Sequence, residues 1–568
     1  GETVIFSNQL GAKTLLNRIK EIQPVIPGNI LNEKNWNILL SVISGQSTFR
    51  KRDRQKSKDR KTKGGVKNII KEELYKVDMQ QEAIGKTIPP GPQRIRGIAG
   101  SGKTILLSQK AAHMHLKHPD WKIALIFFTR SLYDNTIKEV DKWVRRFSNG
   151  EMGYDPDMNK NLKIFHAWGE KNREGFYRMI CEHHHYRPLS AGSSKLGDGP
   201  PNKKLILACK IFLEKQEQVN PVFDAVLIDE AQDLLVDDDD LKYRGKQPFF
   251  WLAYQSLKET GDSGEKRLIW AYDEAQSLNS LNVPTARELF GDQLRFRRMV
   301  SGFHKGSIRK SEVMNKCYRT PGPILVAAHA LGMGLLRPGG MLRGYTTQED
   351  WENIGYEIKE GSFRPGKKIV LHRPEENTPN KVPEFWVDPV INFNNYNTRK
   401  EELDHLADSI KNDINQHKLN PSRDILVIVL GDFREAFKLK IEAARHLMNK
   451  GVDIYIPKSL RNNELYPKYP DIDPDKFWNR GGVTITNIHR AKGNEAYMVY
   501  VIGLDKIAEN EADFSLRNQL FVALTRTKGW LKVMGVGNFP FYNEFRDVLK
   551  SGNTFEFTFQ RLLDEKVN

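Results

Sequence analysis

The chain has 568 residues and a formal net charge of +17, with 39% hydrophobic, 10% aromatic and 28% charged residues. This length is enough for two or three domains with complete cores, and the composition is that of a globular protein. The basic balance favours a polyanionic partner such as nucleic acid.

The cysteines and the apolar runs exclude further classes. Cys181, Cys209 and Cys317 are too widely spaced for a zinc site, an iron–sulfur cluster or a disulfide framework, so we expect a reducing, cytoplasmic setting. The longest apolar runs, such as residues 425–431, are too short to span a membrane and are typical of buried strands. No signal peptide is visible, and because the chain begins with Gly1 we expect a trimmed or processed N-terminus.

The first 74 residues contain no motif with recognisable chemistry. Residues 1–48 have the pattern of a strand and two helices, as in a small docking layer or the end of a truncated domain. Residues 50–67 hold ten Lys or Arg against two Asp and are poor in apolar residues. We therefore expect a basic, mobile linker over residues 49–74, with a solvated charge run favoured over a binding site.

The sequence GIAGSGKT, residues 97–104, fits the phosphate-loop pattern G-x-x-x-x-G-K-[ST] and is followed by an apolar helical start. The residues expected to hold a nucleotide here are Gly97, Gly100, Ser101, Gly102, Lys103 and Thr104. The glycines allow backbone N–H groups to surround a triphosphate, the lysine reaches the β and γ phosphates, and the threonine hydroxyl reaches Mg²⁺. A chance match in a chain rich in glycine and lysine is the less favoured alternative.

Apolar runs recur along the rest of the chain in two groups separated by helical segments. The first group comprises residues 123–129, 162–168, 223–234 and 267–278, and the second comprises 368–374, 424–431, 452–457, 483–489, 498–504 and 531–537. Strands that are apolar throughout and alternate with helices indicate parallel sheets covered on both faces. We therefore predict an α/β fold with domains at 75–312 and 313–568, and a helical insertion over about 135–222.

An acidic pair follows one of these strands. Asp229 and Glu230 begin the sequence DEAQD directly after the apolar residues VLI. Beside a phosphate loop, the first carboxylate can hold the Mg²⁺ shell and the second can orient and deprotonate the attacking water. A solvated acidic loop is the alternative, and it is the favoured interpretation of the run at 237–240.

Nine short motifs follow one another along the chain. They are QQEAI, GIAGSGKT, FFTRS, IFHAW, DEAQD, YDEAQSL, CYRT, TNIHRAKGNE and VALTRTK. Together they resemble the motif series of the UvrD/Rep-like helicases of superfamily 1, from about residue 75 to 537. The resemblance implies two tandem RecA-like P-loop NTPase domains that use ATP and Mg²⁺.

The same resemblance implies roles around the nucleotide. Gln80 would read the adenine edge, and Tyr318 would stack on the base. Gln276 would sense the γ-phosphate, beside Asp273. The loop that joins nucleotide to nucleic acid would contain Lys492, Gly493 and Glu495.

Two arginines are expected to reach the γ-phosphate from the second domain, Arg319 in CYRT and Arg526 in VALTRTK. Charge that develops on a transferred phosphoryl group is best stabilised by arginines that arrive when two domains close. An ordinary helix-face salt bridge is the alternative for both residues.

For contacts with a single strand, the resemblance implies Phe128, Thr129, His166, Thr486 and His489. An aromatic ring offers a stacking face worth about 1–3 kcal/mol per base. A plain core position is an equal alternative for Phe128, and a weaker one for His166.

The sequence departs from the family pattern in two places. Residues 278–282 are LNSLN, where the family carries a Tyr-x-Trp-Arg run that stacks on bases. Only about 25 residues lie between 457 and 483, too few for the large subdomain that the family inserts there.

These patterns favour an ATP-dependent translocase or helicase on single-stranded DNA, with RNA as an alternative and a 3′–5′ direction implied by the resemblance. A nucleic-acid-stimulated ATPase that gates a partner nuclease, in a bacterial defence or repair complex, is the second hypothesis. A P-loop kinase or small-molecule NTPase is a third, and it predicts no arginine-bearing second domain.

Overall fold

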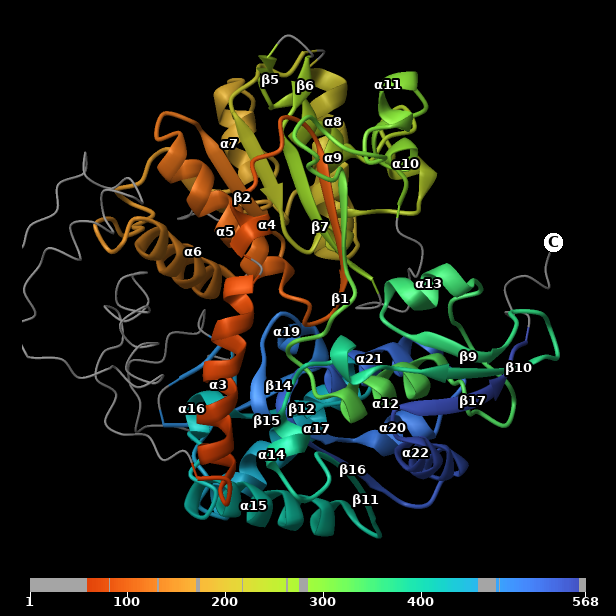
Figure 1. Ribbon diagram of the computed structural model, residues 1–568. Helices are drawn as coiled ribbons and strands as arrows, with labels where there is room; N and C mark the ends of the chain where they lie inside the picture. Colours follow the sequence, from red (N-terminus) through yellow and green to blue (C-terminus); the bar gives the residue numbers. More distant parts are fainter. Residues whose placement is uncertain are drawn as a thin grey trace, which may run out of the picture.

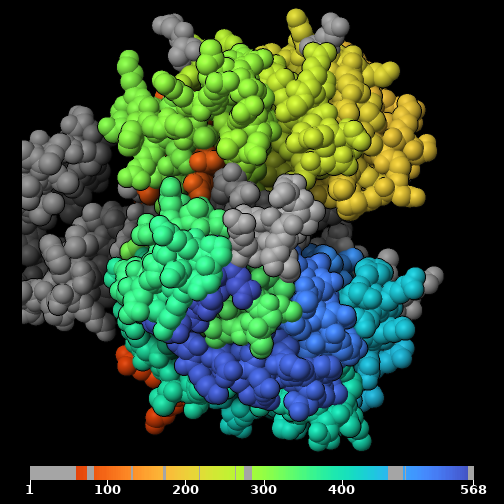
Figure 2. All heavy atoms as spheres, turned by 90° about the vertical axis from the view of Figure 1, so that its right-hand side faces the viewer, coloured from red at the N-terminus to blue at the C-terminus, as the bar shows by residue number. Residues whose placement is uncertain are grey.

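The computed structural model describes residues 59–80, 82–129, 132–169, 174–216, 218–261, 264–274, 284–457, 477–479 and 481–560. These residues form two lobes, each built on a sheet (Figure 1). The space-filling view shows the lobes as separate masses, the first yellow to green and the second mostly green to blue (Figure 2). No helix in the described ranges combines the length and apolar character needed to cross a bilayer.

The first sheet has six parallel strands in the order β3-β2-β4-β7-β1-β8. Its strands are β1 (Gln93–Ile98), β2 (Ile123–Phe127), β3 (Leu162–His166), β4 (Ala225–Ile228), β7 (Leu268–Glu274) and β8 (Ser311–Met314). Every residue of β2 is buried, and its successive side chains enter two different core clusters: Ala124 and Ile126 in one, Leu125 and Phe127 in the other. Both faces are therefore covered, as the apolar runs predict.

Helices provide this cover. They are α4 (Glu82–Gly85), α5 (Lys103–Lys117), α6 (Tyr133–Phe147), α7 (Phe176–His183), α8 (Pro201–Lys215), α9 (Pro248–Gln255), α10 (Ala286–Phe290) and α11 (Leu294–Arg297). A short hairpin, β5 (Glu259–Thr260) and β6 (Glu265–Lys266), lies at the far end of this lobe (Figure 1). Helices α5 and α6 share one core cluster, and α7, α8 and α9 share the other. The span predicted as a helical insertion, 135–222, contains most of α6, then β3 of the central sheet, and then α7 and α8.

The second sheet also has six parallel strands, in the order β11-β16-β15-β12-β14-β13. They are β11 (Ile391–Tyr396), β12 (Ile425–Val429), β13 (Ile454–Tyr455), β14 (Val483–Asn487), β15 (Ala496–Ile502) and β16 (Thr527–Val536). The α/β fold with two parallel sheets is thus confirmed. Strand β11 escapes the sequence analysis because it is an edge strand rich in asparagine, with most of its side chains exposed or half-buried.

One predicted parallel strand has a different setting. Residues 368–372 form β10, which lies outside the parallel sheet, between β9 (Glu357–Gly361) and β17 (Thr554–Thr558) in an antiparallel sheet. Its side chains alternate between buried Ile369 and Leu371 and less buried neighbours, so the strand has one wet face. From the sequence, an apolar run of this length is equally compatible with a strand in a buried parallel sheet and with a strand in an antiparallel sheet.

The helices of the second lobe complete the fold. They are α12 (Gly322–Met333), α13 (Gln348–Asn353), α14 (Val382–Phe385), α15 (Arg399–Asn415), α16 (Pro421–Asp424), α17 (Phe433–Asn449), α19 (Ile488–Ala491), α20 (Leu504–Ala508), α21 (Phe514–Leu524) and α22 (Pro540–Ser551).

The described part of the predicted basic linker is a packed helix, so the expectation of a mobile linker is wrong for this part. Helix α3 (Lys63–Gln80) begins against the second lobe and runs up to α4 in the first (Figure 1). Val66 and Ile70 are buried in the core of the second lobe. Lys63 and Lys67 form ion pairs with Asp413 and Asp424 at 2.7 and 2.5 Å. The lysines that suggested a solvated run therefore have buried acidic partners far along the chain.

Candidate nucleotide site

The phosphate-loop sequence forms a tight turn between β1 and α5. Gly100 and Gly102 have φ angles of +80° and +94°, a left-handed conformation that glycine adopts readily. Glycine is required at position 97 for a steric reason, because a Cβ there would lie 2.7 Å from Ser101 Oγ and 2.8 Å from Met314 Cβ. Ser101 itself is fully buried. The backbone of this turn therefore needs glycine at all three positions.

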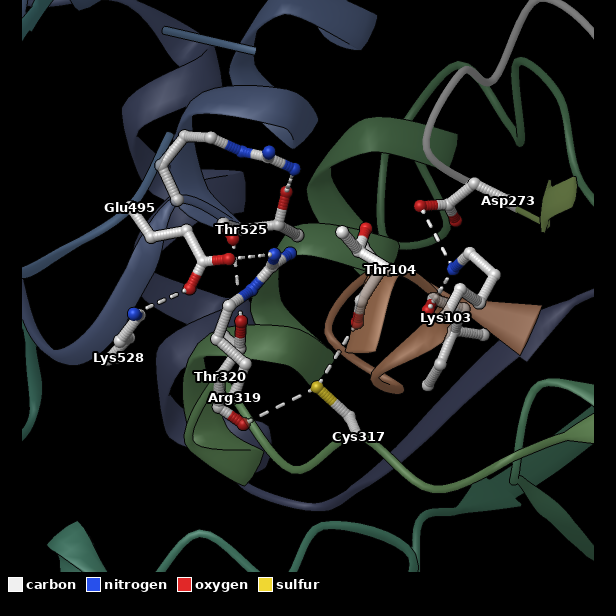
Figure 3. Close-up of polar contacts among 12 residues, drawn as sticks. Lys103, Thr104, Asp273, Cys317, Arg319, Thr320, Glu495, Thr525 and Lys528 are labelled. Carbon is white, nitrogen blue, oxygen red and sulfur yellow. Dashed lines mark hydrogen bonds and ion pairs between the residues drawn. The ribbon is translucent and has the colours of Figure 1, made fainter. Parts of the chain in front are cut away.

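Lys103 lies at the centre of this turn. Its Nζ donates to the carbonyl oxygens of Gly97 at 2.9 Å and Ile98 at 2.8 Å, and it lies 3.3 Å from Asp273 Oδ2 (Figure 3). The ammonium is thus held at the mouth of the loop by two carbonyl oxygens and one carboxylate. A phosphate that displaced the two carbonyls would find a cation already in place.

An acidic centre adjoins the loop. Thr104 Oγ1 donates to Asp229 Oδ2 at 2.7 Å, so the two predicted Mg²⁺ ligands already touch. Burial and the neighbouring charge of Glu230 raise the pKa of Asp229 above its ordinary value. Glu230 has a φ of +50°, a conformation that costs a residue with a side chain about 1–2 kcal/mol. Two oxygen ligands and a second carboxylate beside a phosphate loop match what Mg²⁺ prefers.

A glutamine connects the two acidic strand ends. Gln232 donates from Nε2 to Glu230 Oε2, and its Oε1 accepts from the backbone N–H of Asp273 at 3.1 Å. Asp273 is buried and keeps Oδ1 without a hydrogen-bond partner among the described residues. Burial raises its pKa to about 6, against the opposing charge of Lys103. Sequence reasoning assigned no role to Gln232, although it lies inside DEAQD.

Residues that follow β8 cover the phosphate loop. The backbone N–H of Tyr318 donates to Gly100 O at 3.0 Å, and Cys317 Sγ donates to Ala99 O at 3.3 Å. A Cβ on Gly100 would lie 2.8 Å from Cβ of Arg319 and 3.1 Å from its Nε. Arg319 therefore lies directly on the loop.

Arg319 is held by an acid from the second lobe. Its Nη1 donates to Glu495 Oε1 at 2.8 Å, and Lys528 Nζ lies 3.1 Å from the other carboxylate oxygen (Figure 3). Burial alone would raise the pKa of Glu495, but the two cations hold it down, to about 2. Nε and Nη2 of Arg319 are buried without a partner in the described chain. Glu495 thus orients Arg319 in the structure, and two nitrogens of Arg319 stay available to an anion.

The second predicted arginine approaches the same acids. Arg526 is fully buried, and its Nε and Nη2 donate to Val522 O at 3.0 Å and Thr525 Oγ1 at 3.1 Å. Its Nη1 has no partner among the described residues. Burial and the like charge of Arg319 lower its pKa to about 10, while the charges of Glu230, Asp273 and Glu495 oppose this shift. A buried guanidinium with an unpaired nitrogen, close to acids of the other lobe, is arranged to receive an anion.

An ion pair joins the lobes beside this site. Lys492 Nζ bonds Asp233 Oδ1, at the end of DEAQD. A Cβ on the neighbouring Gly493, which has a φ of +78°, would lie 2.6 Å from Leu132 Cδ2. The segment HRAKGNE of the second lobe therefore contacts the first lobe through both residues. Asp233 was quoted in the sequence motif but given no role.

The five predicted nucleic-acid residues differ in their surroundings. Phe128 is half-buried and stacks on His166, with ring centroids 5.7 Å apart. His166 is buried, and its Nδ1 accepts from the backbone of Trp168 at 3.1 Å, which fixes the loop after β3. Thr129 is half-buried and its hydroxyl bonds Asp233. These three residues form one group near the interlobe ion pair.

The other two lie on the second lobe at the end of β14. Thr486 is 1% exposed, whereas His489 is exposed. Only the histidine reaches the surface in this conformation, and both assignments stay predictions. Two nucleotide residues also stay untested: the side chain of Gln80, at the end of α3, and the whole of Gln276 lie outside the described parts of the chain.

Comparison with known proteins adds a partial match. The family model of the UvrD-like helicase C-terminal domain matches residues 482–534, from β14 to β16. A comparison with curated protein sequences found no match. Strands β14, β15 and most of β16 are thus similar to the matching part of a UvrD-like helicase C-terminal domain, and this match indicates a helicase-like NTPase.

Two solved structures show distant likeness. The C-terminal domain of a possible DNA helicase from Lactobacillus plantarum WCFS1 is 16% identical, with a TM-score of 0.21, and the match covers 30% of this chain and 89% of that one. A variant of Dbp5 from S. cerevisiae, bound to RNA and ADP with beryllium fluoride, is 11% identical with a TM-score of 0.39. That match covers 84% of this chain and 86% of the other.

Proposed function

We propose that this protein hydrolyses ATP to move along single-stranded nucleic acid, in the 3′–5′ direction on DNA. The observation that carries the proposal is the pair of arginines beside the phosphate loop. Arg319 touches Gly100, and Arg526 lies near enough to Asp273 to shift its pKa. The third hypothesis, a P-loop kinase or small-molecule NTPase, predicts no second domain that bears such an arginine.

In the proposed reaction, Lys103 and the loop amides bind the phosphates, and Thr104 with Asp229 holds Mg²⁺, which neutralises phosphate charge when bound. Glu230 orients the attacking water and accepts its proton. Arg319 and Arg526 stabilise the charge that develops on the γ-phosphoryl group. The fit is supported by the unpaired buried nitrogens of both arginines, which point to an anionic ligand.

Movement requires that a change in the bound nucleotide alter the contacts between the protein and the strand. We propose that Lys492 and Asp233 transmit it, because their ion pair joins the lobes next to both sites. Thr129 bonds the same Asp233 and belongs to the predicted strand contacts. Closing and opening of the lobes would then shift one group of strand contacts relative to the other.

The test measures ATP hydrolysis with and without a single-stranded oligonucleotide, of DNA and of RNA, and then unwinding of a duplex with a 3′ or 5′ tail. Stimulation by single strands with directional unwinding or displacement is expected. Stimulation without any movement would favour the ATPase that gates a partner nuclease. No stimulation by either nucleic acid would contradict the proposal.

A further inference from the structure

Two phenylalanine side chains at the start of α17 lie outside the hydrophobic core clusters of the described residues. Phe433 is 76% exposed and Phe437 is 47% exposed. They are four residues apart on a helix, so their rings lie on the same face. The helix packs through a different face, which includes Ala436, Ala443 and Leu447. The core of the lobe therefore does not account for these two rings.

Their position connects them to the proposed path of the strand. Strands β12 and β14 are neighbours, with Val429 opposite Asn487. The chain leaves β12 to start α17 and leaves β14 to start α19. Phe433 and His489 thus follow adjacent strands at the same edge of the sheet, the edge from which α19 faces the first lobe (Figure 1).

A buried cation lies beside the rings. Nζ of Lys440 is 5.1 Å from the ring centroid of Phe437, and the residue is 8% exposed. Lys440 forms no hydrogen bond or ion pair with any residue of the described chain. Its pKa is lowered by burial and by the like charge of Arg490 in α19. A lysine nine-tenths buried, next to a second cation and with no acidic partner among the described residues, has a charge that an anionic group from outside would stabilise.

The outer side of the helix adds positive charge. Arg434, Lys438 and Arg445 are exposed and lie in one row next to the two rings, and the exposed acid Glu442 lies between the last two of them. The surface therefore combines flat aromatic faces with cations on both sides. Single-stranded nucleic acid has the complementary chemistry, with bases that stack and phosphates that pair.

We propose that Phe433 and Phe437 form a base-stacking surface for single-stranded nucleic acid, and that Lys440 contacts the phosphate beside the stacked bases. The inference rests on the proposed function and extends its strand-binding path onto α17. It also supplies stacking residues to a chain whose residues 278–282, LNSLN, contain no aromatic residue. The occupant is a polynucleotide; a protein segment bound here is an outcome that the test would expose.

The test compares the affinity of the full chain for a fluorescent single-stranded DNA oligonucleotide in wild type, Phe433→Ala and Phe437→Ala. Loss of one stacked base predicts a fall of about 5- to 150-fold in affinity. Phe→Trp at either position is expected to retain binding, whereas Phe→Leu is not, because leucine is apolar but offers no ring. Quenching of a 2-aminopurine base in the oligonucleotide reports stacking directly. Phe303→Ala is the matched control, since Phe303 is 63% exposed on the first lobe, away from this surface.

Lys440→Met tests the phosphate contact. The substitution keeps the length of the buried stem, and it is expected to reduce the slope of log affinity against log salt by about 0.7. The inference is overturned if wild type binds the oligonucleotide and all these variants show the same affinity, quenching and salt slope as wild type. The proposed function would remain in that case. Wild type that binds neither DNA nor RNA would instead refute the proposed function.

Discussion

Arg526→Met is expected to abolish most ATP turnover without destabilising the protein. Arg526 is fully buried, and its pKa lies near 10 instead of 12.5 because burial and Arg319 oppose its charge. A difference of this size corresponds to about 3 kcal/mol of unfavourable environment for the charged form. The two hydrogen bonds to Val522 and Thr525 offset about 1 kcal/mol each. Removing the guanidinium should therefore leave the free energy of unfolding unchanged or about 1 kcal/mol higher.

The rate of ATP hydrolysis, unlike the stability, should fall strongly. An arginine that stabilises the transferred phosphoryl group contributes about 10³- to 10⁵-fold to kcat, so we expect Arg526→Met to lose at least about 10³-fold. ATP affinity should change by less than about tenfold, because the contact strengthens mainly in the transition state. The measurements are steady-state ATPase rates, ATP binding by calorimetry and the thermal midpoint without nucleotide.

Arg517→Met provides the matched control for stability. Arg517 is equally buried, but its guanidinium is paired with Glu544 at 2.8 Å and with Glu511 at 2.6 Å. Removing one partner of a buried ion pair typically costs about 3–5 kcal/mol, so this variant should be clearly destabilised. If Arg526→Met unfolds as easily as Arg517→Met, the arginine is structural. If it loses ATP affinity as severely as turnover, its assignment to the transition state is wrong.

Three further outcomes are expected. Lys103→Ala should abolish turnover, measured as steady-state ATPase activity, because it removes the cation at the centre of the phosphate loop. A variant as active as wild type would contradict the role of Lys103. Gly100→Ala should destabilise the protein by about 1–2 kcal/mol in thermal unfolding and weaken ATP binding, since its φ is +80° and Arg319 leaves no room for a Cβ. Glu495→Gln should lower the thermal midpoint, and its deficit relative to wild type should shrink with acid. The folded-state pKa of about 2 is below the ordinary 4.5, so the stabilisation is complete above pH 4.5 and declines as pH falls toward 2. A deficit independent of pH would show that the charge of Glu495 is not what stabilises the contact.

The sequence predicted the parallel sheets well because buried parallel strands are apolar on both faces. Residues 123–127 and 425–429 are examples, with every side chain buried. The same criterion failed for β11 and β17, whose side chains are partly exposed at sheet edges. A search for alternating patterns would have found Phe555 and Phe557 of β17.

The helix α3 could not have been predicted as packed from local composition. Its lysines look like a solvated run until Asp413 and Asp424 are seen beside them, more than 300 residues later. Pairing over such distances depends on the tertiary fold, which charge counting does not include.

For the site, motif matching located the residues but not what holds them. Glu495 was expected at the nucleotide, and the structure adds that it orients Arg319 together with Lys528. Gln232 and Asp233 lay inside a quoted motif, yet their partners come from β7 and from the second lobe. Contacts of this kind cross between elements and leave no mark in a short linear pattern.

The course of α3 has a practical consequence for anyone who divides this chain. A gene split after β8 would give a carboxyl-terminal half that lacks Val66 and Ile70 in its interior and leaves Asp413 and Asp424 without their lysines. That half is expected to be poorly stable alone and to be rescued by a synthetic peptide spanning residues 59–80. The second lobe is therefore built from two separate stretches of the gene, and deleting residues 59–80 would destabilise it.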